Sequence, residues 1–194
     1  MRLFPTVKRR RAAFVEQMKG KVVLDIGCGR RKLPGSIGVD TRKVSIATDD
    51  VQRDVSHDLL TFPYPFPENH ADAIHCSHVM EHLLPTDKVM EEFYRLLKPG
   101  GLLFIECPHY TWCEAYRHWQ HCHFFTEGSF DFFHAKNEVY NCRFEKVASE
   151  IFFDDFTYVC GMGWIGKFFP GFYERHLGFI FPANVFYVVL KAVK

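Results

Sequence analysis

The chain has 194 residues, a length that suits one domain and leaves little room for a second. Hydrophobic residues make up 47% of it and charged residues 24%, the balance of a packed globular domain rather than a disordered chain. The formal net charge of +1 gives no overall field that would draw in nucleic acid. We therefore expect a single globular domain, 1–194, and the composition disfavours nucleic acid as a partner.

The seven cysteines bear on the compartment in which the protein works. They are odd in number and have no paired, regular spacing, which disfavours a secreted disulfide scaffold. The N-terminus lacks the apolar core of a signal peptide, and no stretch reaches the roughly 18 apolar residues that span a bilayer. These features predict a cytoplasmic protein. A basic run at residues 8–11 is interpreted as a solvated helix face or flexible arm in preference to a phosphate-contacting arm.

Strand-like apolar segments alternate with amphipathic helical segments through the first part of the chain. After an N-terminal helix or arm at 1–20, the clearest helix is 86–97, where Thr86 is the expected N-cap and Val89 and Phe93 share one face. Short links join helix to strand, an order typical of a parallel α/β sheet with crossover helices. The expected strands are 22–26, 37–40, 53–55, 71–76, 102–105, 144–153 and 185–193.

Aromatic residues crowd the second half of the chain. Thr126 is expected to cap a further helix that carries Phe130 and Phe133 on its inner side. Residues 155–182, rich in glycine and aromatic side chains, are the expected insertion between the last two strands. A large aromatic core is the first interpretation of these side chains. The alternatives are an apolar substrate pocket, an exposed docking patch, or contact with a membrane or lipid-linked acceptor.

The most informative segment runs from an apolar strand into a Gly-x-Gly turn, VLDIGCG at 23–29. Glycines there permit a tight turn and let a ligand lie against the backbone. Asp25 lies near the strand end, and Asp40 ends the next strand, where an acidic residue can accept both hydroxyls of a ribose. A dinucleotide fingerprint would carry a third glycine, but Lys32 stands at that position, which disfavours NAD.

Four segments together resemble the class I S-adenosylmethionine (SAM)-dependent methyltransferases, in particular the small type 11 branch. They are VLDIGCG (23–29), GVD (38–40), DAIHCSHVMEHL (72–83) and LLKPGGLLFIECP (96–108), and together they span about half of the chain. The resemblance implies SAM as the cofactor and a small-molecule or sugar-linked methyl acceptor. It also implies a single Rossmann-like, doubly wound α/β domain, with a mostly parallel seven-stranded sheet whose final strand, 185–193, is antiparallel.

The resemblance also implies which residues bind the cofactor. They are Asp25, Gly27, Cys28 and Gly29 at the glycine turn, Asp40 at the ribose, Asp58 and Leu59 beside the adenine, and Ser77 at the tip of the fourth strand.

One departure from the family's pattern is the short interval between Gly27 and Asp40, which is thirteen positions where about 20 is usual. A Pro-Gly pair at 34–35 falls within it. The helix that normally follows the glycine turn is therefore expected to be a stub or absent. Such a short loop leaves the basic residues 30–32 near the site, either paired with the SAM carboxylate or solvated.

The chemistry expected of such a site is mainly positional, because SAM carries an already activated methyl group. Holding acceptor, methyl carbon and sulfur in line is worth roughly 7–11 kcal/mol at best. A general base is needed only for a hydroxyl or protonated amine. The candidates that follow strand tips are His78, His109, Tyr110 and His121, each with a hydrogen-bonded structural role as the alternative.

The histidines and cysteines between residues 109 and 123 also raise the question of a metal. Their spacings do not repeat in a paired zinc pattern, so no metal ligand is predicted and a His-rich loop over a pocket is preferred, with a metal site as the alternative. His82 is interpreted as an anchor for its own short helix at 78–83.

Two other function classes stay open. A non-catalytic SAM-binding module would keep the glycine turn and Asp40 but lack an acceptor pocket. A nucleic-acid methyltransferase would use the basic run at 8–11. The Asn/Asp-Pro-Pro-Tyr motif of amino-group nucleic-acid enzymes is absent, however, because residues 76–79 read Cys-Ser-His-Val at that place.

Overall fold

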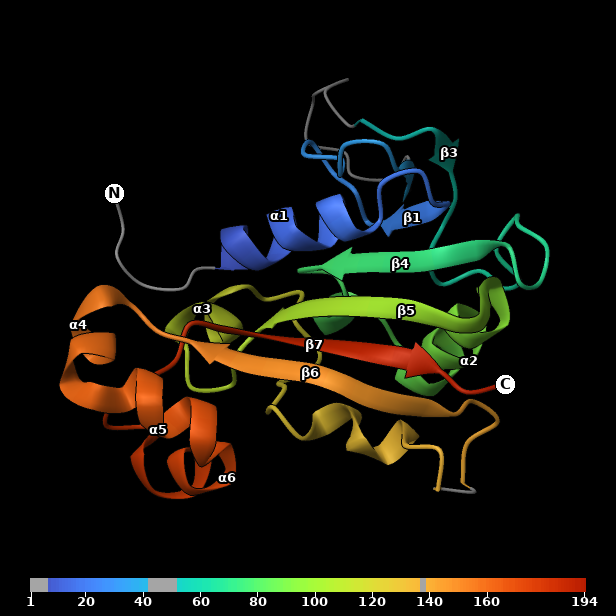
Figure 1. Ribbon diagram of the computed structural model, residues 1–194. Helices are drawn as coiled ribbons and strands as arrows, with labels where there is room; N and C mark the ends of the chain where they lie inside the picture. The colour runs from blue at the N-terminus through green and yellow to red at the C-terminus, as the bar shows by residue number, and fades with distance from the viewer. Residues whose placement is uncertain (1–6, 42–51, 137–138) are drawn as a thin grey trace.

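The computed structural model describes residues 7–41, 52–136 and 139–194. Their strands form one seven-stranded sheet in the order β3-β2-β1-β4-β5-β7-β6 (Figure 1). The pairings from β3 through β5 are parallel, whereas β7 runs antiparallel to both of its neighbours. The predicted α/β fold with an antiparallel final strand is confirmed. The strands are β1 (Val23–Ile26), β2 (Ile37–Asp40), β3 (Val55–Ser56), β4 (Ala71–Ser77), β5 (Leu97–Pro108), β6 (Phe144–Phe152) and β7 (Val185–Ala192).

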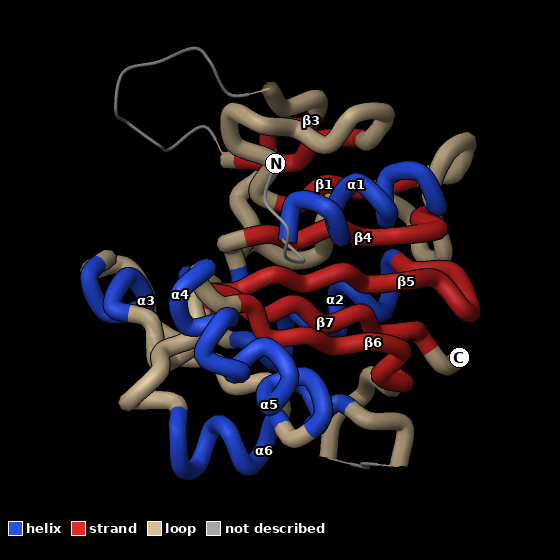
Figure 2. Tube along the Cα trace, turned by 60° about the vertical axis from the view of Figure 1, so that its left-hand side comes forward, coloured by secondary structure: helices blue, strands red, loops and turns tan. Residues whose placement is uncertain are grey.

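Two helices pack on opposite faces of this sheet (Figures 1 and 2). α1 (Val7–Gln17) packs Phe14 against Phe104 of β5, with ring centroids 5.1 Å apart. α2 (Thr86–Leu96) shares the core of the other face with Ile105. Since successive side chains of a strand point to opposite faces, neighbouring residues of β5 reach the two different helices. The central strands are therefore buried on both sides, which agrees with the predominance of apolar residues in them.

Both expected caps were wrong. Pro85 occupies the N-cap position of α2, and Thr86 is the first helical residue, whose hydroxyl contacts His123 Nε2 at 2.8 Å. The extended conformation that a cap needs is taken by Pro85, with ψ of 134°. Thr126 likewise caps no α-helix, because the segment that follows is a 3₁₀ turn, η2 (Ser129–Phe133), which begins after Gly128.

Residues 155–182 form a helical cap on the edge of the sheet where the parallel strands end. Some of its aromatic side chains belong to the core, as Tyr173 is fully buried and its hydroxyl donates to the Phe181 carbonyl at 2.8 Å. Many others are exposed, so the segment is both core and surface. None of the described helices has the length and apolar character of a membrane span. The cap comprises α4 (Asp155–Thr157), η3 (Tyr158–Met162), α5 (Gly163–Phe168), α6 (Pro170–Phe172) and η4 (Tyr173–Leu177).

The connection from β1 to β2 contains turns and no helix, as the short interval predicted. Gly27 opens it with φ of +66°, and Gly35 closes it with φ of +77°. A Cβ atom on Gly27 would lie 2.3 Å from Val79 Cγ2, whereas one on Gly35 would meet nothing within 4 Å. Gly27 is thus required both by its left-handed backbone and by the close packing of Val79. Gly35 is favoured by its left-handed backbone alone.

We expect Gly27→Ala to destabilise the protein more than Gly35→Ala. Both variants incur the cost of a left-handed backbone with a Cβ atom, about 1–2 kcal/mol. Gly27→Ala must also displace Val79. The free energy of unfolding from urea titrations measures both losses, and equal losses would contradict the close approach of Val79 to the glycine turn.

Candidate functional site at the carboxyl ends of the strands

The carboxyl ends of β1, β2 and β4 meet at one edge of the sheet. β1 lies between β2 and β4, so that Asp25 is opposite Gly38 on one side and His75 on the other. The strand order reverses between β1 and β4. In open α/β sheets, ligands bind in the crevice beyond the carboxyl ends of the strands at such a reversal. The predicted cofactor residues of the glycine turn therefore lie where this architecture places a ligand.

The glycine turn and Asp40 are joined directly by hydrogen bonds. The Gly29 amide donates to Asp40 Oδ2 at 2.7 Å, and the Thr41 amide donates to Oδ1 at 2.7 Å. The Gly27 amide donates to the Val39 carbonyl at 2.8 Å. Each carboxylate oxygen can accept more than one hydrogen bond, so Asp40 still has capacity for hydroxyl donors. The three residues on which the sequence argument rests thus come together.

Asp25 and His75 form a buried pair that the sequence analysis missed. Asp25 Oδ1 lies 2.6 Å from His75 Nδ1, and Oδ2 accepts the Leu33 amide at 2.7 Å. The two side chains are 3% and 1% exposed, so both polar groups depend on each other for hydrogen bonding. His75 Nε2 has no hydrogen-bond partner among the described residues, and its ring stacks on Phe104. A histidine between two apolar residues of a predicted strand, Ile74 and Cys76, was the available sequence signal.

A cavity of about 330 Å³ lies above this pair. Its floor includes Asp25, Gly27, Cys28, His75 and Ser77, and its rim carries Arg11, Arg30 and Arg31. Arg11 extends from α1 and donates to the Arg31 carbonyl at 2.8 Å, which ties the helix to the loop after the glycine turn. Three guanidinium groups at the rim make the cavity suitable for an anionic group such as a carboxylate.

The remaining residues of the glycine loop have different neighbours. Burial, followed by the nearby Asp40 carboxylate, raises the pKa of the Cys28 thiol to about 12, so this thiol is a neutral part of the lining. Lys32 is paired with Asp54 at 2.8 Å. Asp54 also accepts the Gly38 amide at 2.7 Å. Lys32 therefore fixes the loop to the β2 side of the sheet, while its two arginine neighbours line the cavity.

Asp58 and Leu59, predicted beside the adenine, follow β3. The His57 amide donates to the Asp40 carbonyl at 2.9 Å, which brings this segment next to the glycine-turn site. Leu59 is buried and its carbonyl accepts the Tyr64 hydroxyl at 2.8 Å. Asp58 Oδ1 accepts the Leu60 amide at 3.1 Å. The segment thus lies next to the glycine turn, and its role beside the adenine stays a prediction.

His78 lies at the tip of β4 between two acidic side chains. Its φ is +55°, and its Nε2 and Nδ1 atoms lie 3.1 Å from Glu106 and 3.5 Å from Glu81. Burial opposes protonation of the ring, but hydrogen bonds and attraction to Glu106 and Glu81 outweigh it and raise the His78 pKa to about 9. At neutral pH the ring is a cation and cannot accept a further proton. This disfavours His78 as the general base.

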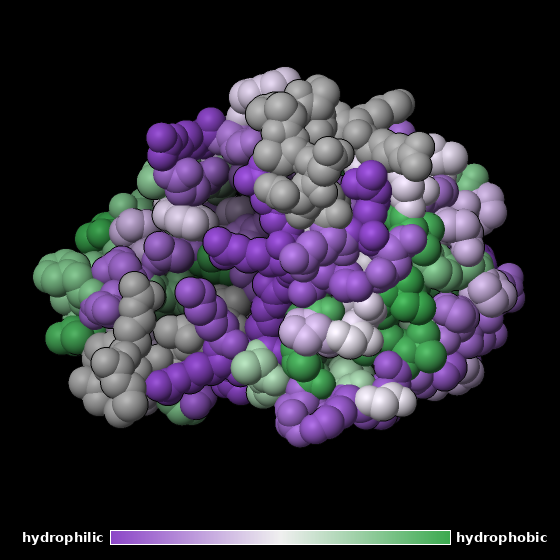
Figure 3. All heavy atoms as spheres, turned by 90° about the horizontal axis from the view of Figure 1, so that it is seen from above, coloured by the Kyte–Doolittle hydropathy of each residue, from purple (hydrophilic) through white to green (hydrophobic). Residues whose placement is uncertain are grey.

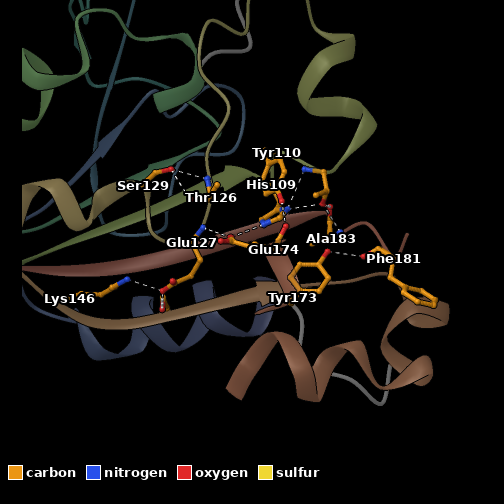
Figure 4. A network of polar contacts seen from close by, with 12 residues as sticks. His109, Tyr110, Thr126, Glu127, Ser129, Lys146, Tyr173, Glu174, Phe181 and Ala183 are labelled. Atoms are coloured by element: carbon orange, nitrogen blue, oxygen red, sulfur yellow. Dashed lines mark hydrogen bonds and ion pairs between the residues drawn. The ribbon is translucent and has the colours of Figure 1, made fainter. Parts of the chain in front are cut away.

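His109 and Tyr110 lie beneath the helical cap (Figure 4). His109 is fully buried, with Nε2 at 3.1 Å from Glu174 Oε1 and Nδ1 at 2.8 Å from Thr111 Oγ1. The Tyr110 hydroxyl donates to the Glu174 carbonyl, and Glu174 Oε1 also accepts the Glu127 amide at 2.7 Å. Because both ring nitrogens of His109 are occupied, the geometry favours a role in tying the cap to the end of β5.

His121, the fourth candidate base, lies in the segment after α3 (Cys113–Arg117), apart from both the β4 tip and the base of the cap. Its Nδ1 atom is 2.9 Å from the Ala115 carbonyl, and its ring packs against His82 and His118. The four candidates thus divide among the β4 tip, the base of the cap and the segment after α3. Their roles in catalysis stay predictions.

Comparison with known proteins establishes the family of this chain. Residues 2–137 match the family model described as "Methyltransferase domain". The chain belongs to the methyltransferase domain family. The resemblance to class I SAM-dependent methyltransferases is confirmed, and with it SAM as the cofactor of the family.

Individual relatives agree on the family but differ in what they act on. The chain is 35% identical over 106 residues to tRNA (carboxymethyluridine(34)-5-O)-methyltransferase of Arabidopsis thaliana, a match that covers 48% of this chain and 26% of the relative. It is 31% identical over 101 residues to ubiquinone biosynthesis O-methyltransferase of Photorhabdus laumondii subsp. laumondii, covering 44% and 42%. The matched part thus spans less than half of either relative.

A solved structure matches the fold over nearly the whole chain. The SAM-dependent methyltransferase from Archaeoglobus fulgidus superposes with a TM-score of 0.66 and 21% identity, covering 95% of this chain and 92% of that one. At this identity the likeness concerns the fold alone.

We expect the His78 ring to titrate near pH 9 instead of near its ordinary value of 6.5. Because the folded pKa is the higher one, protonated His78 stabilises the fold below pH 6.5, and this contribution is lost as the pH rises through about 9. NMR of the ring resonances against pH measures the titration. Glu106→Gln should lower the pKa of His78, and Glu145→Gln, at an exposed position of β6, should not. An unchanged titration in Glu106→Gln would refute the pairing.

Proposed function

We propose that this protein transfers a methyl group from SAM to a small-molecule or sugar-linked acceptor. The observation that carries the proposal is the 2.7 Å hydrogen bond between the Gly29 amide and Asp40, which closes the glycine turn against the tip of β2. Together with the adjacent cavity, this contact supports an adenosyl site at the strand-order reversal. Family membership adds independent support.

The residues present fit SAM in charge and shape. Asp40 would accept the ribose hydroxyls. The rim formed by Arg11, Arg30 and Arg31 would bind the carboxylate of the methionine part. Gly27 has no side chain, which lets Val79 pack directly against the turn that forms part of the cavity. When bound, SAM supplies a methyl group on a sulfonium centre.

The acidic residues around His78 at the tip of β4 would stabilise a cationic centre such as the sulfonium of SAM. The trio of His78, Glu81 and Glu106 places two acidic side chains around one basic ring, so acidic groups outnumber basic ones there. Glu106 lies beside Ser77 in the β4–β5 register, and Ser77 lines the cavity. A sulfonium ion near Ser77 would be stabilised by the two carboxylates, which are nearly buried, although solvent reaches the exposed His78 ring beside them. We assign the trio a role in holding and orienting the reacting groups.

The helical cap supports an acceptor with an apolar part. Figure 3 shows apolar residues at the end of the molecule where the cap lies in Figure 1, as well as a second group near the opposite end. Lys167 and Arg175 lie among the apolar residues of the cap and could meet anionic headgroups. A lipid-linked sugar would combine both features. The exposed apolar residues of the cap are Phe156, Val159, Trp164, Phe168, Phe169, Phe172, Phe179 and Ile180.

The tRNA-modifying relative makes an RNA acceptor the second candidate. The basic run does not support it, because the residues lie in α1 and two of them bind within the protein. Arg10 pairs with Glu150 at 2.6 Å, and Arg11 donates to the Arg31 carbonyl. These contacts favour a structural use of the run over contact with phosphates.

Turnover with three acceptor classes tests the proposal. The protein is incubated with SAM and soluble sugar derivatives, vesicles containing a polyprenyl-phosphate sugar, or tRNA, and S-adenosylhomocysteine is followed by mass spectrometry. We expect product with a sugar-linked acceptor, and unchanged turnover in the Lys8→Gln/Arg9→Gln variant. Product with tRNA alone would establish the second candidate. SAM binding with no product from any class would favour a non-catalytic module.

A further inference from the structure

Three histidines from two separate segments converge outside the proposed cofactor site. His82 ends η1 (Met80–His82), while His118 and His121 follow α3. One ring nitrogen from each lies within 4.8 Å of one from each of the others. The ring centroids are 5.3 Å apart for His82 and His118, 4.7 Å for His82 and His121, and 4.9 Å for His118 and His121. Nothing in the proposed methyl transfer uses this cluster.

We propose that His82, His118 and His121 bind a divalent transition-metal ion, with zinc as the best fit. Imidazole nitrogens are preferred ligands of zinc, and three of them leave a fourth tetrahedral position for water or another ligand. Zinc–nitrogen bonds of about 2.0–2.1 Å place tetrahedral ligands roughly 3.4 Å apart. Since the nitrogens lie within 4.8 Å of one another, they need to approach by at most about 1.4 Å, which rotations of partly exposed side chains can supply.

The outer hydrogen bonds of two rings match those of metal-bound histidines. His121 Nδ1 lies 2.9 Å from the Ala115 carbonyl, and His82 Nδ1 lies 3.3 Å from the Gln120 carbonyl. A carbonyl can only accept, so in the neutral form of each ring Nδ1 carries the proton and Nε2 has the lone pair that a metal needs. A ligating histidine ordinarily donates its second ring N–H to such a partner, which fixes the ring and its tautomer. His118 Nδ1 accepts the Gln120 amide more weakly, at 3.4 Å.

The metal would fasten the segment after α3 to the tip of β4. The two parts are already joined where the Cys122 amide donates to the Glu81 carbonyl at 2.8 Å. Glu81 in turn faces His78. A bound ion would hold the 113–123 segment beside the acidic residues at the β4 tip. This role is structural, and it goes beyond the proposed methyl transfer and does not depend on it.

Metal titration tests the proposal. Tag-free protein, treated with a chelator and dialysed, is titrated with ZnCl₂ in a calorimeter and with CoCl₂ in a spectrophotometer. We expect saturation at about one ion per chain and the visible absorption of tetrahedral cobalt. His82→Asn and His121→Asn should lose more affinity than the roughly 10–100-fold that follows loss of an outer partner. His176→Asn, at an exposed position of the cap, is the matched control and should bind as the unmodified protein does.

Two further measurements keep the outcome clear. Circular dichroism checks that each variant folds. If His82→Asn does not fold, His118→Asn is used in its place, because His118 is the most exposed of the three ligands. Zinc should also slow proteolysis within residues 113–123. Absence of saturable binding near one ion per chain would overturn the proposal. Equal binding by the ligand variants and the His176→Asn control would overturn it as well.

Discussion

The candidate cofactor site depends on the way in which aspartates satisfy the backbone of the loop between β1 and β2. In a longer connection, a helix would pair most of these amides. Here Asp40 accepts from Gly29, and Asp25 accepts from Leu33, both at 2.7 Å. Unpaired buried amides would be costly, so the two carboxylates stabilise a loop that has no regular structure of its own. The same contacts bring the glycine turn to the tip of β2.

The histidines show how one residue type serves several physical roles in a single domain. His75 supports Asp25 beneath the cavity, His78 holds a positive charge between Glu106 and Glu81, and His109 anchors the helical cap. Each role follows from local burial and from the nearest carboxylate. A count of histidines near strand tips therefore overstates the number available as bases. The structure instead directs attention to the acidic residues that surround His78.

The alternation of apolar strands with one strong amphipathic helix predicted a parallel α/β fold, and the resemblance to class I methyltransferases predicted the seven-stranded sheet with an antiparallel final strand. The sequence also predicted that Gly27 and Asp40 would meet, since parallel strands bring their carboxyl ends to one edge. Caps were predicted less well: Thr86 has a good capping side chain, but Pro85 takes the extended backbone that defines the position. The convergence of His82 with His118 could not be predicted, because 36 positions separate them and no pattern of spacing records the contact.

Calorimetric titration with SAM tests the central claim most directly, if the unmodified protein is compared with Asp40→Asn. We expect the unmodified protein to bind one SAM per chain. Asp40→Asn should weaken binding by roughly 10–150-fold, since a hydrogen bond to a charged group contributes about 1.5–3 kcal/mol. Asp87→Asn, in the first turn of α2, is the control and should bind normally. Thermal unfolding shows whether Asp40→Asn keeps its fold. A folded Asp40→Asn protein that binds SAM as tightly as the unmodified one, or an unmodified protein that does not bind SAM, would contradict the account.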